Sequence, residues 1–99
     1  MKPEDVHSPR KRWSLIDVLY DGGEDPDEDA LAIGRWDKQV VLAARWNGEA
    51  GSHGNPVSTG HPTWFILPKW YYPHVLKSER VHAAKRQLAE ALLGEAAKG

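Results

Sequence analysis

Residues 30–65 read ALAIGRWDKQVVLAARWNGEAGSHGNPVSTGHPTWF, and this stretch decides the fold. It holds two apolar runs, each followed by Arg-Trp and a turn residue, and then a Gly-rich segment that leads into a third apolar run. Asp37 and Lys38 separate the first two runs, and a two-residue connection is the spacing of a tight β-hairpin. We therefore expect residues 30–36 and 39–46 to form paired antiparallel strands.

The apolar pattern also predicts the register of this hairpin. With a two-residue turn, Ile33 lies opposite Leu42 and Leu31 lies opposite Ala44, so the large aliphatic side chains share one face. A slip by one residue would scatter these side chains over both faces of the sheet. The pattern therefore favours the register set by the short turn.

The acidic segment before the hairpin leaves one alternative open. Asp25 is a suitable helix N-cap, Pro26 fits the first helical position and Glu28 fits the third. Residues 25–34 would then form a short helix that ends at Gly34. The hairpin accounts for more of the sequence, and we favour it over this helix.

Two further strands and a helix are expected outside the hairpin. Residues 13–20 are rich in β-branched and aromatic side chains and precede a Gly-Gly turn, which predicts a strand. Residues 63–67 are continuously apolar and bounded by Pro, which predicts an interior strand covered on both faces. From residue 73 the apolar period becomes helical, and Gly94 is a suitable end for that helix. Its buried stripe is expected to contain Val81, Ala84, Leu88 and Leu92, and to be widened by Val75, Leu76, Ala91 and Leu93.

Together these elements predict a single α+β domain over residues 13–94. We expect a mainly antiparallel sheet of about four strands with one C-terminal helix packed on one face. Residues 1–12 are expected to form a flexible N-terminal arm, and residues 95–99 a frayed C-terminus. The sheet face that the helix leaves open would be covered by the long loop or by a second copy of the chain, as in a homodimer.

A long polar segment follows the hairpin at residues 47–62. It has Gly, Pro, Asn or Ser at almost every other position and no apolar periodicity, which predicts a loop. Loops of this length in small domains are either functional or disordered, and both interpretations stay open here. An ordered loop would form a binding site together with neighbouring aromatic residues. The expected ligand- or partner-binding residues are Trp46, His53, Asn55, Ser58, His61, Trp64 and Trp70.

The favoured function is therefore a small non-enzymatic binding or accessory protein with a small-molecule or protein partner. The chain contains five Trp, and Trp, Tyr and Arg side chains dominate the energetics of recognition. At least one aromatic ring of residues 69–72 is expected near the surface. No motif identifies a family, although the GNPVSTGHPTWF stretch suggests a small bacterial accessory protein.

A nucleic-acid-associated protein is the alternative function. Two Arg-Trp pairs and a basic-leaning helix would combine phosphate contacts with base stacking. The residues expected in that role are Arg35, Arg45, Lys77, Arg80 and Arg86. The formal net charge of −1 weighs against a dedicated nucleic-acid binder.

A small hydrolase-like enzyme is the second alternative, and a non-enzymatic role is favoured over it. Catalysis would need His61 or His74 beside a hydroxyl or carboxylate in a cleft. Ser58 lacks the Gly-x-Ser-x-Gly spacing of a nucleophile elbow, so no catalytic residue is assigned. The chain has no Cys, and its acidic segment lacks the Gly and Glu of a calcium loop. We therefore expect no metal and no cofactor.

Composition places the chain among ordinary globular proteins, with 40% hydrophobic and 27% charged residues in 99. The charged N-terminus does not resemble a secretory signal, and no run reaches the ~20 apolar residues of a membrane span. We expect a cytoplasmic protein without a membrane partner. Six acidic residues in the segment 21–29 would suit a basic protein partner.

Overall fold

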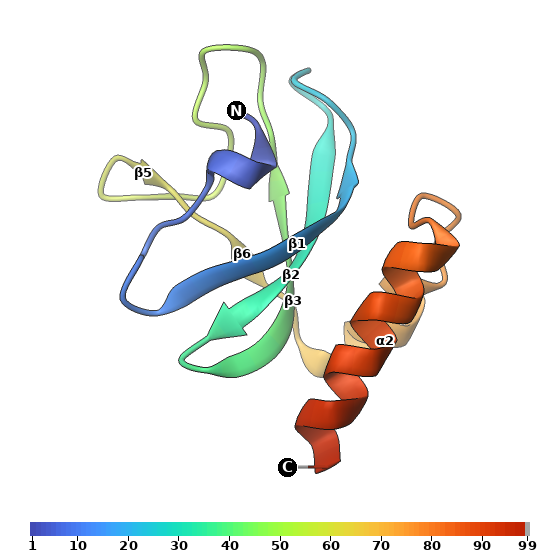
Figure 1. Cartoon of the computed structure of the whole chain (residues 1–99). Coiled ribbons are helices and arrows are strands. Elements are labelled where there is room, and N and C mark those ends of the chain that lie inside the picture. The colour runs from blue at the N-terminus through green and yellow to red at the C-terminus, as the bar shows by residue number, and fades with distance from the viewer. Residues whose placement is uncertain (99) are drawn as a thin grey trace.

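The computed structural model describes residues 1–98, and it describes the side chains of residues 1–95. Its centre is a four-stranded antiparallel sheet in the order β1-β2-β3-β6, as expected for the α+β class (Figure 1). The sheet strands are β1 (Trp13–Asp21), β2 (Asp29–Trp36), β3 (Gln39–Trp46) and β6 (Phe65–Ile66). The smaller elements are η1 (Pro3–Asp5), β4 (Val57–Ser58), β5 (His61–Pro62), η2 (Lys69–Tyr71) and α1 (Tyr72–Leu76). Helix α2 (Ala83–Lys98) ends the described chain.

The hairpin of β2 and β3 is confirmed in its register. Ile33 pairs with Leu42 and Leu31 pairs with Ala44. Asp37 and Lys38 have φ values of 49° and 73°, which are the left-handed conformations that a type I′ hairpin turn requires. The alternative helix over residues 25–34 is wrong. Pairing on both sides of β2 satisfies its backbone groups along the whole strand, whereas an isolated two-turn helix is unstable.

Apolar and polar residues do not alternate regularly along β1, because the strand contains two register shifts. Its pairing with β2 shifts between Leu15 and Asp17 and again between Val18 and Tyr20. Each shift adds an unpaired residue, as in a β-bulge, and so changes which side chains face the core. Ile16 and Leu19 consequently pack on the face that the helices cover.

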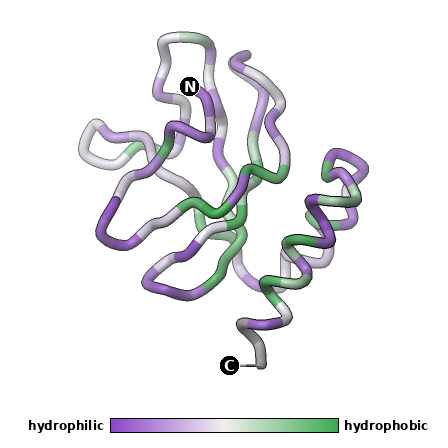
Figure 2. The backbone as a smooth tube through the Cα atoms, viewed as in Figure 1, coloured by the Kyte–Doolittle hydropathy of each residue, from purple (hydrophilic) through white to green (hydrophobic). Residues whose placement is uncertain are grey.

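The sheet has a hydrophobic core on each of its two faces. On the face that we call the helix face, the buried residues are Leu19, Leu31, Ile33, Leu42, Leu67, Leu76, Val81 and Ala89. On the opposite face, the loop face, they are Val6, Trp13, Ala30, Ala32, Val41, Ala43 and Trp64. Figure 2 shows hydrophobic residues gathered in the middle of the long strands and hydrophilic residues in the turns at their ends.

The N-terminal residues, expected to form a flexible arm, instead contribute to the core of the loop face. Val6 is fully buried there. Trp13 packs against Trp64 with ring centroids 5.8 Å apart. Gly34 is required beneath this pair, because a Cβ at that position would overlap the Trp13 ring. The segment therefore covers the loop face of the sheet.

The third apolar run does not form an interior strand. Only Phe65 and Ile66 pair with β3, at the edge of the sheet. Trp64 and Leu67 are buried, whereas Phe65 is exposed. The run therefore alternates between the core and solvent, although its continuous hydrophobicity indicated burial on both faces.

The C-terminal helix differs from the expectation in two ways. It is divided into α1 and α2, because the chain turns at residues 77–82. The Arg86 side chain donates hydrogen bonds to the backbone carbonyl oxygens of Leu76, Ser78 and Val81. These bonds stabilise the turn. Helix α2 continues beyond Gly94 to Lys98, so residues 95–98 are helical, while residue 99 lies outside the described residues.

The predicted apolar stripe is confirmed at Val81, Leu92 and Leu93 but not at the positions between them. Ala89 is fully buried, and Leu92 and Leu93 are partly buried against the same core. Ala84 and Leu88 are exposed instead. Because α2 begins after a turn, its rotation is not fixed by the periodicity that starts in α1.

Candidate functional site

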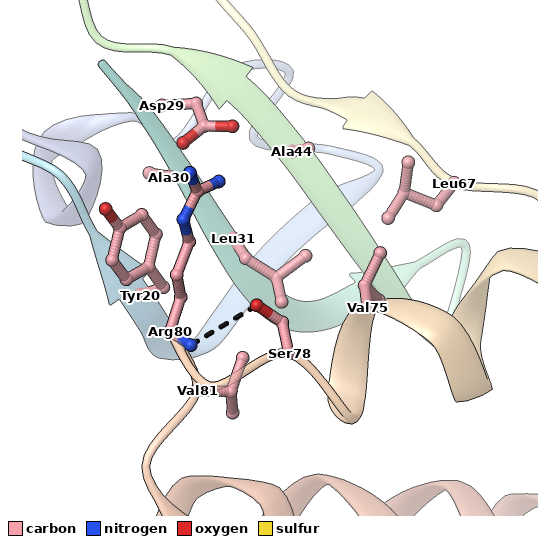
Figure 3. A pocket seen from close by; sticks show the side chains of 10 residues that line it. All are labelled: Tyr20, Asp29, Ala30, Leu31, Ala44, Leu67, Val75, Ser78, Arg80 and Val81. Carbon is pink, nitrogen blue, oxygen red and sulfur yellow. Dashed lines mark hydrogen bonds between the residues drawn. The ribbon is translucent and has the colours of Figure 1, made fainter.

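Two adjoining hollows lie on the helix face of the sheet. The first encloses about 160 Å³ between the sheet and the turn that joins α1 to α2 (Figure 3). Its apolar side chains are Leu31, Ala44, Leu67, Val75 and Val81. Polar groups at this hollow come from Tyr20, Asp29, Ser78 and Arg80.

Arg80 lies at the mouth of the first hollow. Its guanidinium carbon is 5.9 Å from the centroid of the Tyr20 ring, within range of a cation–π contact. Its backbone N–H donates a hydrogen bond of 3.2 Å to the Ser78 hydroxyl. Figure 3 shows the Arg80 side chain between Tyr20 and Asp29. Neither Asp29 nor Arg80 forms an ion pair with another side chain among residues 1–95.

The second hollow encloses about 530 Å³ and continues from the first. The two hollows share Asp29 on β2 and Ala44 on β3. The second hollow is lined in addition by Arg45, Trp46, Asn55, Pro56, Val57 and Phe65. We refer to both hollows together as the groove.

Three large apolar side chains are exposed at the groove. Trp46 is 51% exposed, Val57 43% and Phe65 56%. The strand register places Trp46 and Phe65 close together. Phe65 pairs with Ala44, and Trp46 lies two residues after Ala44 on the same face of β3. Exposed apolar patches of this kind mark interaction sites on small proteins.

A buried Arg45 holds the loop of residues 47–62 beside the groove. The Arg45 guanidinium donates hydrogen bonds to the carbonyl oxygens of His53, near the middle of this loop, and of Thr63, directly after it. Burial lowers the pKa of Arg45, but a guanidinium stays charged in proteins. The loop is therefore anchored by a structural cation.

Backbone pairing supports the same loop. Trp46 and Asn55 exchange two backbone hydrogen bonds of 2.7 and 2.9 Å. Gly54 beside them has a φ of 62°, and a Cβ at that position would overlap the Trp46 carbonyl. Further along, β4 and β5 form a small hairpin. The loop thus has defined structure.

Asn47 links the loop to the acidic segment of residues 21–29. Its side-chain N–H groups donate hydrogen bonds of 3.0 Å to the Asp21 carboxylate and 2.9 Å to the Gly23 carbonyl. Asn47 is completely buried, and its backbone N–H bonds the Glu28 carbonyl at 3.0 Å. These bonds hold the acidic segment next to Trp46.

The structure brings together only part of the predicted binding set. Trp46 and Asn55 line the groove. Trp64 is buried, with its indole N–H bonded to the Val6 carbonyl. His53 offers its carbonyl to Arg45, and its side chain is exposed. Ser58 is exposed in β4.

His61 and Trp70 lie away from the groove. His61 borders a separate hollow with Asp5, His7, Ser8 and Arg10. Trp70 belongs to η2, which follows β6 toward the opposite end of β3. Val40 lies near that end of β3, six residue steps from Trp46, which corresponds to about 20 Å along the strand.

Four groove residues were not among the predicted site residues: Tyr20, Asp29, Val57 and Phe65. Arg80 was expected only in the nucleic-acid alternative. One signal was available for Phe65, because consecutive strand residues point to opposite faces. A buried Trp64 therefore implies an outward-facing Phe65. The others depend on contacts between distant segments.

The residues expected to bind nucleic acid do not form one surface. Arg45 and Arg86 are bonded to backbone carbonyls inside the fold. Arg35 lies near the hairpin turn, whereas Arg80 lies at the groove. Lys77 is exposed after α1. A basic surface able to bind nucleic acid would therefore have to contain other residues than these five.

His61 and His74, the side chains considered for catalysis, belong to β5 and α1 respectively. Among the described residues, no group of three or more His, Asp or Glu side chains is placed to hold a metal ion. No hydrogen bond joins His61 to Asp5, His7 or Ser8 within residues 1–95. His74 is exposed on α1.

Within residues 1–98 there is no helix with both the length and the apolar character that crossing a membrane requires. No protein-family model, curated protein or solved structure matches the chain. The groove is consequently interpreted from its geometry and charge.

Proposed function

We propose that this protein is a non-enzymatic binding module whose groove receives a protein segment. The segment would insert a large apolar side chain beside Trp46 and Phe65 and place basic residues against the acidic segment 21–29. The observation that supports this proposal is the exposure of three large apolar side chains around one hollow.

Covering the two aromatic rings supplies a large part of the binding free energy. About 100 Å² of apolar surface removed from water on each ring contributes about 2–3 kcal/mol before the costs of association. The floor at Leu31 and Ala44 then accepts the tip of an inserted side chain. Aromatic anchors in such pockets are typical of interface hot spots.

The charge beside the groove favours a basic partner. Among the described residues, five of the six carboxylates in residues 21–29 have no ion-pair partner, because only Glu24 pairs, with the N-terminal ammonium at 2.9 Å. Asp29 extends this negative charge into the groove itself. Complementary charge raises the association rate and suppresses acidic partners.

Selection of phage-displayed random peptides on the immobilised protein tests the proposal. We expect enrichment of peptides that carry an aromatic or large aliphatic residue next to Lys or Arg. A selected peptide should shift the amide resonances of residues 44–46, 55, 57 and 65 in a heteronuclear NMR titration.

Matched variants show whether the groove is responsible. Trp46→Ser and Phe65→Ser should each weaken binding of the selected peptide at least tenfold. Leu88→Ser is the control, because Leu88 is also exposed but lies on α2 outside the groove. Equal binding by the wild type and Trp46→Ser, or selected peptides without basic residues, would contradict the proposal.

A further inference from the structure

A strongly basic hollow lies at the end of the sheet opposite the acidic segment. It encloses about 330 Å³, next to the turn between β2 and β3. Five cationic side chains and one carboxylate line it: Arg10, Lys11, Arg12, Arg35, Lys38 and Asp37. The net charge of −1 for the whole chain hides this separation of charge.

The fold brings these residues together from distant parts of the chain. The Asp37 backbone N–H donates a hydrogen bond of 2.8 Å to the Arg12 carbonyl. The Asp37 carboxylate accepts two hydrogen bonds from the Arg12 guanidinium, one of them 3.0 Å long. Arg12 also stacks over Trp36, 4.4 Å from the ring centroid. The N-terminal basic run is thereby fixed beside the hairpin turn.

Four of the five cations remain uncompensated. Arg12 is neutralised by Asp37, whereas Arg10, Lys11, Arg35 and Lys38 form no ion pair with any side chain in the described part of the chain. Four positive charges around one concave surface produce a local potential that attracts anions. A single small anion would not neutralise them.

The basic surface extends into a neighbouring hollow of about 620 Å³. The two hollows share Arg35 and Lys38, and the second adds Lys69, with Glu95 as its one carboxylate among the described lining residues. Trp70 follows Lys69 in η2 and is 70% exposed. Trp70 thus adjoins a residue of the basic surface in the chain, and an exposed aromatic ring near a basic track is the combination that stacks on unpaired bases.

We propose that this basic end, formed by Arg10, Lys11, Arg35, Lys38 and Lys69, binds the phosphate backbone of a single-stranded nucleic acid, with Trp70 stacking on a base. Of the five basic residues first expected in that role, only Arg35 belongs to this surface. The site is separate from the groove and does not depend on the peptide-binding proposal.

Fluorescence anisotropy with labelled oligonucleotides of equal length tests this inference. The arms are single-stranded DNA, single-stranded RNA and duplex DNA, each measured at several salt concentrations. We expect single strands to bind more tightly than the duplex. With five phosphate contacts, one for each basic residue of this surface, the plot of log K against log salt should have a slope of about −3.5.

Charge variants locate the surface. Lys11→Gln and Lys38→Asn should each weaken binding about fivefold near 0.1 M salt and reduce the slope by about 0.7. Asn is chosen at position 38 because its φ of 73° is a conformation that Asn tolerates. Asp37→Asn removes the one carboxylate found among the described lining residues of the 330 Å³ basic hollow, and it should strengthen binding.

Lys77→Gln is the matched control, because Lys77 is exposed after α1 and lines neither basic hollow. Circular dichroism confirms that each variant is folded. Absence of binding at the lowest salt concentration would overturn the inference. So would equal losses in Lys77→Gln and Lys38→Asn, or tighter binding of the duplex than of the single strand.

Discussion

The indole N–H of Trp64 donates a hydrogen bond of 2.9 Å to the carbonyl oxygen of Val6, which lies 58 residues earlier in the chain. Both residues are buried on the loop face. The bond therefore fastens the N-terminal segment over the sheet at the point where β6 begins. It makes Trp64 a residue of the core.

Replacing Trp64 by Phe tests this structural role. The variant loses the donor and leaves the Val6 carbonyl buried without that partner, so we expect a loss of about 1–3 kcal/mol in the free energy of unfolding. Urea denaturation measures the difference. Trp70→Phe is the control, since Trp70 is largely exposed, and its stability should change by less than about 0.5 kcal/mol.

The anchoring of the loop by Arg45 leads to a second prediction. Arg45→Met should lower the free energy of unfolding by about 2–4 kcal/mol, because two carbonyl oxygens lose a charged donor. Arg45→Lys should not restore stability fully, since one ammonium cannot reproduce the guanidinium fork. Hydrogen exchange should accelerate in residues 48–56. Unchanged exchange there would show that the loop holds its structure without Arg45.

The rotation of α2 can be tested at two adjacent positions. Ala89→Glu introduces a carboxylate at a fully buried site and should destabilise the fold by about 3 kcal/mol or more. Leu88→Glu falls on the exposed side of the same turn and should cost less than about 1 kcal/mol. Thermal unfolding of both variants gives the comparison. The periodicity of the sequence predicts the opposite order.

Local features of the sequence determined which elements could be predicted. The two-residue turn at Asp37 and Lys38 and the alternation of the flanking strands define the hairpin and its register, since both signals act over short distances. The exposed ring expected in residues 69–72 is Trp70. By contrast, the division of the C-terminal helix depends on Arg86 reaching back to three carbonyl groups. No local pattern reveals that contact.

The candidate site was predicted only in outline. Trp46 was expected there, and it lines the groove beside Asn55. Trp64 was expected to bind a ligand but is buried, because an aromatic residue in an apolar run does not show which face it occupies. Asp29 and Arg80 meet at the groove from β2 and from the turn before α2, 51 positions apart in the sequence. Such a meeting follows from tertiary packing alone.

The ion pair of Arg12 and Asp37 should make the stability of the fold depend on pH. Hydrogen bonding from Arg12, together with its charge, lowers the pKa of the Asp37 carboxyl below its usual range. The pair therefore stabilises the fold above the unfolded-state pKa of about 4, and this contribution is lost as the pH falls through the folded-state pKa. In an NMR titration of carboxyl resonances, Arg12→Gln should return the pKa of Asp37 toward its ordinary value. An unchanged Asp37 titration would mean that the pair is not maintained in solution.

Ala44 offers a direct test of the groove, because its small side chain lines both hollows. Ala44→Leu fills this space without removing any side chain that we expect to contact the partner. Ala44 is only partly buried and the added atoms would enter the hollow, so we expect little loss of stability. Binding of a selected peptide should nevertheless fall at least tenfold, whereas binding of single-stranded nucleic acid at the basic end should not change. If the peptide still binds Ala44→Leu as tightly as the wild type, its apolar anchor does not enter the groove.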